Sequence, residues 1–476
     1  MAEAVVTAPS SYGSLEWKGV WRALDALCAG VAPEVGHQLA FQVIFLRCWP
    51  TPFGVGLARI SGPAEPALSS VWARLGLHRP VGPGATGGAQ ARRLHPKADR
   101  ALAALIAEVE RLEETSGLFD ACLDRYSSRF GTGGDYYTPR SLARLMVGLA
   151  APRAGDRVLD PACGSGRLLI AAEQWARKQD HGTGVLSLHG RDIRPEARRV
   201  AAMNLMLHGL HHDLGEGAID SLRTTPADLL TDIVLVNPPL NVKDWQGGEL
   251  TEDPRWRLGT PPKGNANFVW VQHVLNRLSS EGQAVVLLPD SATRSLSTAE
   301  TRIRRRLVER DLLAGVVALP ARLFPHTRTG TTLWLFSKDK RASGRWGRRS
   351  RVGETLFVDG RQLGARSGRS ARRLTDENID LICSLFASWR GISSDEDCSE
   401  PREVNWCRSV RQDDIARRGY DLGPGSYVQT PIAALGPAGA EGQHRFARDT
   451  LYEHFDHTAR ISQRLRHVLG TEDGSW

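Results

Sequence analysis

The sequence contains no pattern of paired cysteines. Its seven cysteines are an odd number, and no two of them are spaced as Cys-x-x-Cys. Neither a zinc knuckle nor a disulfide framework is favoured, we expect no metal site, and a reducing cytoplasm is the natural compartment. The amino terminus lacks a basic segment followed by an apolar one, and no stretch is apolar for the length that a bilayer crossing requires. We therefore expect a soluble cytoplasmic protein with no membrane partner.

No internal repeat is evident in the sequence. With 476 residues, of which 41% are hydrophobic, the chain can bury large cores and is long enough for two or three domains. Its formal net charge of +8 fits a polyanionic partner. Many basic proteins bind no nucleic acid, so the charge alone favours such a partner only modestly.

Helical patterns occupy the first part of the chain. Apolar residues recur at helical spacing in residues 17–27 and 37–49, and a second helical stretch spans 101–126. Between them, a Gly/Pro-rich segment near 79–90 has the composition of a flexible connector. We assign residues 1–115 to an N-terminal helical domain.

From about Gly133 onward, short apolar strands alternate with helices. The strand candidates lie at 157–160, 185–192, 232–237, 284–289, 315–320 and 331–338. This alternation predicts an α/β fold, a doubly wound and Rossmann-like sheet, over residues 116–390.

Beyond about residue 390 the periodicity weakens. We assign residues 391–476 to a C-terminal extension that ends in a helical tail at 446–470. Arginines cluster at 341–351 and again at 361–373. Each cluster is interpreted either as a solvated loop or as a contact with phosphate, because arginine serves both purposes.

A glycine-rich turn follows the first predicted strand. The segment DPACGSG, Asp160 to Gly166, ends that strand and opens a helix. Glycines at 164 and 166 let the backbone turn tightly and approach a ligand, and the free N–H groups of the new helix face that ligand. One such turn is weak evidence for a site, since many strand-to-helix connections need glycine for geometry alone.

Acidic residues extend this candidate site. The predicted strand 185–192 ends in Asp192, where nucleotide-binding α/β folds place the acid that binds ribose hydroxyls. The segment GAIDSL offers Asp220 at the end of a third strand, placed to meet the exocyclic amine of an adenine ring.

Upstream, Tyr136, Tyr137, Thr138 and Pro139 lie at a predicted helix start, where a bulky lid over a small ligand would sit. Thr138 before Pro139 is also common helix-start chemistry. Taken together, the turn, the acids and the lid outline a nucleoside pocket.

The strand at 232–237 stops at Asn-Pro-Pro. Prolines donate no hydrogen bond, so the ladder ends and the carbonyls of Asn237 and Pro238 face the carboxyl edge of the sheet. The Asn237 side-chain oxygen and a proline carbonyl can accept both hydrogens of a planar amine, which favours direct transfer from a methyl sulfonium. The motif alone indicates a plain turn. Its position as the fourth strand end after the glycine-rich turn favours a site.

Longer motifs carry a resemblance to a known family. They are, in chain order, YTPRSLARLM, DPACGSG, NPPLNVKDW, DPRWRLGTPPKGNANFVWVQHVLNRL, VVALPARLFPHTRTGTTLWLFSKDK, LFVDGRQLG, WCRSV and GYDLGPGSYV. Over most of its length the chain resembles the adenine-N6 DNA methyltransferases that use S-adenosylmethionine, and within them the methylation (modification) subunit of type I restriction-modification systems. The segments GNANFVWVQH and NVKDW are the most specific of these motifs.

The resemblance implies adenine N6 methylation of double-stranded DNA. The positions that match the family's S-adenosylmethionine site are Tyr137, Thr138, Pro139, Asp160, Pro161, Gly164, Ser165, Gly166, Asp192 and Asp220. The target adenine would be flipped into a catalytic pocket formed by Asn237, Pro238, Pro239 and Leu240.

Leu240 departs from the family pattern, in which this position is aromatic. A flipped base stacks on a ring for about 1–3 kcal/mol, and leucine offers only a dry wall. Loss of that contact corresponds to roughly a ten- to hundredfold weaker reactive state. The sequence leaves open whether Phe268 or Trp270 supplies a ring instead.

Base reading requires a further partner. After the α/β domain about eighty residues remain, which is few for a base-reading domain. The resemblance implies a separate specificity subunit flanked by two methylation subunits, with a restriction subunit as a further partner. The predicted final helix is the natural contact for the specificity subunit, although this helix can also pack on its own domain.

Three functions remain open at this point. The first is a DNA adenine methylation subunit. The second is a methyltransferase that acts on another planar amide or amine, against which GNANFVWVQH and the basic charge argue. The third is a catalytically impaired subunit that acts in DNA binding or complex assembly, and it is motivated by Leu240.

Overall fold

The computed structural model describes residues 15–49, 94–130, 138–180, 185–223, 229–243, 245, 253–324, 329–343, 345–367, 371–392 and 406–428. The predicted connector near 79–90, Tyr136, Tyr137 and the predicted helix at 446–470 lie outside these residues. Among the described helices, none combines the length and the apolarity that a membrane crossing requires.

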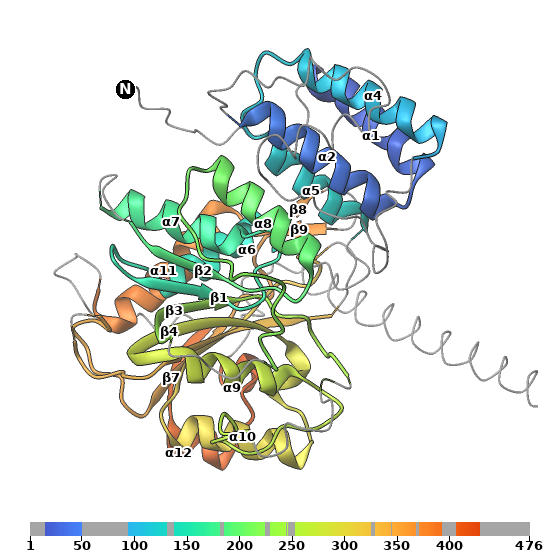
Figure 1. The fold of residues 1–476 in the computed structure, drawn as a ribbon. Coiled ribbons are helices and arrows are strands. Elements are labelled where there is room, and N and C mark those ends of the chain that lie inside the picture. Colours follow the sequence, from blue (N-terminus) through green and yellow to red (C-terminus); the bar gives the residue numbers. More distant parts are fainter. Residues whose placement is uncertain are drawn as a thin grey trace, which may run out of the picture.

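Helices form the N-terminal part of the fold (Figure 1). They are η1 (Leu15–Trp17), α1 (Lys18–Gly30), α2 (Pro33–Cys48), α4 (Pro96–Glu110) and α5 (Leu118–Phe130). Because α2 contacts α1, α4 and α5, it is buried on nearly every side, and its Phe41 and Phe45 are fully buried. The helices predicted at 17–27, 37–49 and within 101–126 are confirmed.

The N-terminal helical core extends past residue 115, where we placed the end of this domain. Phe119, Leu123 and Tyr126 of α5 share one apolar core with α1, α2 and α4. Two residues of α8 (Pro195–Leu207), Val200 and Met203, complete that core. The division into domains itself stays a prediction.

An eight-stranded sheet forms the centre of the fold, with the strand order β10-β7-β5-β6-β4-β3-β1-β2. Its strands are β1 (Arg157–Asp160), β2 (Ser187–Gly190), β3 (Thr231–Val236), β4 (Leu278–Pro289), β5 (Leu313–Ala318), β6 (Thr331–Ser337), β7 (Glu354–Asp359) and β10 (Cys407–Arg411). The strands are parallel except for β6 and β10, which run antiparallel to their neighbours. All six strand candidates are confirmed.

Helices cover both faces of this sheet, as a doubly wound fold requires (Figure 1). One face carries α6 (Arg140–Ala150), α7 (Arg167–Gln179) and α11 (Asp376–Arg390). The other carries α9 (Asn267–Arg277), α10 (Thr298–Glu309) and α12 (Gln412–Arg417). The helix α8 is shared, because its Ala201 and Leu205 join the sheet core while Val200 faces the N-terminal helices.

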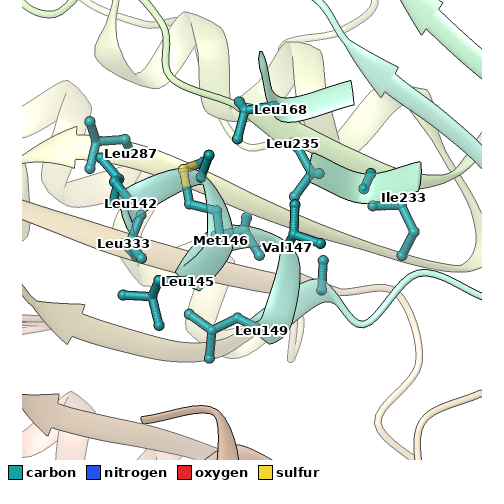
Figure 2. Close-up of a cluster of buried hydrophobic side chains, with 14 of the residues drawn as sticks. Leu142, Leu145, Met146, Val147, Leu149, Leu168, Ile233, Leu235, Leu287 and Leu333 are labelled. Atoms are coloured by element: carbon teal, nitrogen blue, oxygen red, sulfur yellow. The ribbon is translucent and has the colours of Figure 1, made fainter. Parts of the chain in front are cut away.

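Packing of α6 on the sheet fixes where that helix begins. Figure 2 shows Leu142, Leu145 and Met146 of α6 among side chains from the strands, including Ile233 and Leu235 of β3. Each fully buried side chain of this kind stabilises the fold by about 1.5–3 kcal/mol. The start of α6 is thereby held over the carboxyl end of β3.

The strand that we expected to end at Asp220 is absent from the described residues. Only Asp213 pairs with β2, through a single bridge to His189, and the chain then turns at Gly215, whose φ is 71°. Residues 214–223 follow as loop and turn. Asn-Pro-Pro therefore follows the third strand of the chain, not the fourth.

Residues 406–428, which we assigned to a C-terminal extension, belong to the sheet domain. β10 pairs with β7, and Tyr427 stacks on Phe357 of β7 with ring centroids 4.2 Å apart. The elements here, such as η4 (Pro424–Ser426), are too short to give a periodic pattern, which is why the sequence failed to indicate them.

The arginine cluster at 341–351 is largely structural. It lies at the amino-terminal edge of the parallel strands, where Arg345 forms an ion pair with Asp156, the residue before β1. Arg351 donates to the Trp389 carbonyl (2.7 Å) and covers the ring of the same tryptophan. Arg348 is exposed. Neither a solvated loop nor a phosphate contact describes Arg345 and Arg351.

We predict that Arg345→Ala destabilises the protein by about 2 kcal/mol, because Asp156 is 4% exposed and would lose its charge-assisted hydrogen bonds. The matched control is Arg348→Ala, which removes the same charge from an exposed position of the same loop. Thermal unfolding measures both. Equal melting temperatures for the two variants would show that the Arg345–Asp156 pair does not hold this edge together.

Candidate active site

Three of the predicted site residues lie at neighbouring strand ends. Asp160 is the last residue of β1, Asp192 follows β2 by two residues, and Asn237 directly follows β3. Because β3, β1 and β2 are adjacent and parallel, these residues meet at the carboxyl edge of the sheet. The structure thus brings the glycine-rich turn and Asn-Pro-Pro together, as expected.

The turn after β1 is joined to the loop after β2 by the Asp192 carboxylate. The N–H of Gly164 donates to Asp192 Oδ2 and the N–H of Arg194 donates to Oδ1, both at 2.9 Å. Gly164 has φ 53°, a conformation that favours glycine, and a Cβ built there would meet no atom within 4 Å. The turn therefore presents open space to a ligand. A Cβ at Gly166, by contrast, would lie 3.4 Å from Leu205.

Burial shapes the chemistry of Asp160. Its side chain is almost fully buried, and this desolvation raises its pKa to about 8, although the N–H of Ala162 donates to it at 3.1 Å. Burial also raises the pKa of Asp192. Two carboxyl groups in a poorly solvated site favour a cationic partner, because a cation restores the ionised form.

Asp220 reaches the same edge even though no strand carries it. The N–H of Ile219 donates to the Asp192 carbonyl, and the Ser221 hydroxyl donates to the Pro161 carbonyl at 2.7 Å. These bonds tie the loop to both neighbouring turns. Asp220 itself accepts from the N–H of Leu222 and pairs with Arg223.

Arg255 is a site residue that our sequence analysis missed. It is 1% exposed, pairs with Asp253 at 2.6 Å, and donates to the carbonyls of Ser221 and Leu222. Its two hydrogen bonds to these carbonyls therefore hold the loop that carries Asp220 in place. The one sequence feature that could have indicated Arg255 is its place in DPRW. This segment contributes to the family resemblance, but no role was assigned to its residues.

Thr138 and Asn237 are in direct contact. The Asn237 amide nitrogen donates to the Thr138 hydroxyl at 3.2 Å across 99 residues of sequence. Pro139 caps α6 without any side-chain bond, so helix capping, the alternative interpretation of Thr138, is wrong. Ser165 is buried next to this region and its carbonyl accepts from Asn204 of α8 at 2.9 Å.

The Asn-Pro-Pro-Leu turn is fastened by an asparagine that we did not predict. Asn241 has φ 55°, its N–H donates to Asn267 Oδ1, and its Oδ1 accepts from Asn267 Nδ2, both at 3.0 Å. Asn267 is 2% exposed at the start of α9. Within the turn Pro238 is buried, whereas Pro239 and Leu240 are half-buried.

The two rings that could stand in for the one that Leu240 lacks, Phe268 and Trp270, are both buried. Phe268 is fully buried and packs edge-on against Trp334 with centroids 5.9 Å apart. Trp270 is 6% exposed and lies in a cluster with Trp245 and Trp256. Both rings are committed to the interior.

The sheet places an antiparallel strand, β6, between the parallel strands β4 and β5, with its ligand edge at β1 to β3. This topology is that of the class I methyltransferases. It is shared with the methyltransferase subunit of a type I restriction-modification system from Streptococcus thermophilus, with a TM-score of 0.64, 20% identity and coverage of 87% of this chain and 99% of that one.

Sequence comparison is more specific. The family model for N-6 DNA Methylase matches residues 115–433, and the chain belongs to this family. Its relatives include the methylase subunits of the type I restriction enzymes HindI from Haemophilus influenzae, 34% identical over 66% of this chain, and MjaIX from Methanocaldococcus jannaschii, 33% identical over 63%. The alignments span 68% and 52% of those two relatives.

We predict that Asn267→Ala loosens the Asn-Pro-Pro-Leu turn. Loss of two hydrogen bonds, each worth about 1 kcal/mol, corresponds to roughly ten- to thirtyfold faster amide exchange at residues 240–242. Asn276→Ala is the control, since Asn276 likewise makes two side-chain hydrogen bonds from α9, but to the carbonyls of Arg255 and Gln272 and not to the turn. Hydrogen exchange followed by mass spectrometry distinguishes them. Identical exchange in both variants would contradict the role of Asn267.

We predict that Asp160 makes stability depend on pH. Because its pKa rises from the usual 3.8 to about 8, its contribution is fully present below the unfolded value and is lost as the pH rises toward 8. The stability of Asp160→Asn relative to the natural protein should therefore grow between those two values and then level off. Melting temperatures across this range measure the difference.

Asp213 provides the control for that titration. Burial alone would raise the pKa of Asp213, but hydrogen bonds from Arg191, Gly215 and His189 lower it. Its contribution is lost only below the usual aspartate pKa of 3.8, so the stability of Asp213→Asn relative to the natural protein should stay level across the range used for Asp160. Parallel curves for the two variants would mean that Asp160 is ionised at neutral pH in the folded protein.

Proposed function

We propose that this chain is the modification subunit of a type I-like restriction-modification system and that it methylates adenine N6 in double-stranded DNA. The observation that carries the proposal is the contact between Asn237 and Thr138. It joins the residue suited to hold an amine to the helix start that borders the glycine-rich turn. Fold and family are consistent with this chemistry and leave the reaction itself to be tested.

The residues at the carboxyl edge fit S-adenosylmethionine. The open space at Gly164 admits the ligand, and the buried Asp160 favours its cationic end. Asp192 and Asp220 offer acceptors for ribose hydroxyls and an adenine amine. Ile193, next to Asp192, is 58% exposed and gives an apolar surface for the ring, a role that we did not predict.

The proposed cofactor set is therefore the one that the resemblance implies: Tyr137, Thr138, Pro139, Asp160, Pro161, Gly164, Ser165, Gly166, Asp192 and Asp220. When bound, S-adenosylmethionine supplies an activated methyl group.

Asn237 would hold the target amine. A primary amide donates through nitrogen and accepts through oxygen. The nitrogen donates to Thr138, and in this proposal Asn237 Oδ1 accepts one hydrogen of the substrate amine. The Pro238 carbonyl accepts the second hydrogen in this proposal, and the adenine reaches both by leaving the base stack. The fastened turn at Asn241 keeps these acceptors in place.

A second candidate function rests on Leu240. In this alternative neither buried ring, Phe268 or Trp270, supplies the stack on which a flipped adenine would rest, and the half-buried Leu240 takes its place. The loss of about 1–3 kcal/mol corresponds to roughly ten- to a hundredfold. The alternative is therefore a catalytically impaired subunit that acts in DNA binding or complex assembly.

Partners follow from the same proposal. A specificity subunit would read the bases, a restriction subunit would complete the system, and the segment 446–470, which the sequence predicts to be helical, would contact the specificity subunit. The two relatives named above are themselves subunits of restriction enzymes.

We predict that the natural protein, with its specificity partner, transfers tritiated methyl groups from S-adenosylmethionine to unmethylated duplex DNA. Leu240→Phe should transfer them roughly ten- to a hundredfold faster, because it restores the stacking ring. Asn237→Ala is the inactive control and should bind S-adenosylmethionine with nearly unchanged affinity.

The outcomes separate the two functions. Transfer by Leu240→Phe alone would favour the impaired subunit. Transfer by neither protein, with cofactor binding intact, would reject the methyltransferase. Loss of cofactor binding in Asn237→Ala would place Asn237 in the cofactor site instead of the base pocket.

A further inference from the structure

The second arginine cluster differs from the first. Its residues form a hairpin of β8 (Ala365–Ser367) and β9 (Ala371–Arg373), labelled in Figure 1. In the hairpin register Arg366 lies directly opposite Arg372. Like charges at opposed positions repel each other, so this pairing costs stability instead of adding to it. Among the residues that the structure describes, no carboxylate forms an ion pair with either arginine.

A third arginine adjoins this pair at a strained position. Arg322 has φ 66°, a left-handed conformation that disfavours side chains other than glycine, and its carbonyl accepts from the N–H of Arg372 at 2.9 Å. Arg322 is exposed and, within the described part of the chain, has no acidic partner. A backbone outlier and a like-charge pair thus coincide at one place. Such costs persist only where the surrounding structure imposes them, and they cluster at ligand-binding and active sites.

The three arginines lie at the same edge of the sheet as Asn237. The hairpin follows β7, Arg322 follows β5, and Gly360 after β7 donates to the Ala318 carbonyl at the end of β5. Both strands run parallel to β3 and lie three and four places from it in the sheet. At about 4.8 Å per strand, the ends of β5 and β7 lie roughly 14–19 Å from the end of β3 along this edge. The cluster at 341–351 lies at the opposite edge.

We propose that Arg322, Arg366 and Arg372, here called the arginine cradle, bind the phosphate backbone of the duplex whose adenine enters the Asn237 pocket. The inference rests on the proposed function. A flipped adenine stays attached to its strand, so the duplex must lie across this edge of the sheet. Phosphates recur every 3.4 Å along a strand, so a span of 14–19 Å corresponds to about five nucleotides. The planar guanidinium matches a phosphate with two hydrogen bonds.

The cradle binds without regard to sequence, because phosphates carry no base information. Its contribution is therefore measured as salt dependence. For duplex DNA, log K falls with log salt by about 0.9 for each phosphate that is neutralised. Loss of two arginine contacts should reduce this slope by about two.

The test measures the affinity of the full chain for a fluorescent 30-base-pair duplex as salt is raised. Arg366→Gln/Arg372→Gln should lower the slope by about two and the affinity at low salt by about tenfold or more. Arg310→Gln/Arg348→Gln is the matched control, since both residues are exposed near the opposite edge. Arg366→Lys/Arg372→Lys retains the charge and should retain most of the slope.

Stability separates a binding role from a structural one. Removal of the opposed pair relieves repulsion but also removes the two long hydrogen bonds that Arg372 donates to the carbonyls of Arg361 (3.4 Å) and Leu363 (3.5 Å), so the melting temperature of Arg366→Gln/Arg372→Gln should change little. A drop in melting temperature that accompanies the loss of DNA binding would overturn the proposal, as would an unchanged slope or an equal change in the control. No binding by the natural chain at low salt would overturn it as well.

Methyl transfer, measured separately, distinguishes failure of the two proposals. If the natural protein transfers methyl groups normally but the salt slope of DNA binding is the same in Arg366→Gln/Arg372→Gln, only the arginine cradle is rejected. If the salt slope falls in Arg366→Gln/Arg372→Gln but the natural protein transfers no methyl group, the methyltransferase proposal is rejected and the DNA-binding proposal is retained.

Discussion

One carboxylate holds the ligand edge of this sheet together. Asp192 accepts the N–H of Gly164 through one oxygen and the N–H of Arg194 through the other, and its carbonyl accepts the N–H of Ile219. Three loops that belong to different parts of the sequence are therefore fixed by a single residue. The bond to Gly164 fixes the turn in the conformation that leaves open space beside this glycine. In the function proposed above, these hydrogen bonds to Asp192 determine the shape of the cofactor site.

The two edges of the sheet are built on different principles. At the amino edge, charges are compensated: Arg345 meets Asp156, and Arg351 covers Trp389. At the carboxyl edge the costs accumulate. Asp160 is a buried acid with a raised pKa, and Asn241 adopts a left-handed conformation. Contacts at the amino edge stabilise the fold, whereas features of the carboxyl edge destabilise it, as expected where a scaffold carries a functional site.

Local patterns predicted the fold well because its strands are continuous apolar runs. The segments that became β1 and β3 could be placed from sequence, and so could the turn and Asn-Pro-Pro that follow them. Asp220 was predicted to lie at this edge but on a strand, because GAIDSL resembles one. In the structure, side-chain bonds from Ser221 and Arg255 hold it there instead.

Long-range polar contacts account for most of what was missed. Asn241 and Asn267 are 26 residues apart, and nothing in either local pattern pairs them. The arginines at 341–351 look alike in sequence, yet burial makes Arg345 structural and leaves Arg348 exposed. The sequence shows which residues are charged, whereas only the fold shows which of these charges are buried and which groups they contact.

The helix α8 is a lever between two parts of the molecule. Val200 and Met203 are embedded among the N-terminal helices, while Ala201 and Leu205 on the same helix pack against the sheet. Asn204, between them, grips the carbonyl of Ser165 in the glycine-rich turn. One helix therefore contacts the N-terminal core, the sheet core and the glycine-rich turn. The position of that turn consequently depends in part on the packing of N-terminal helices that lie outside the site.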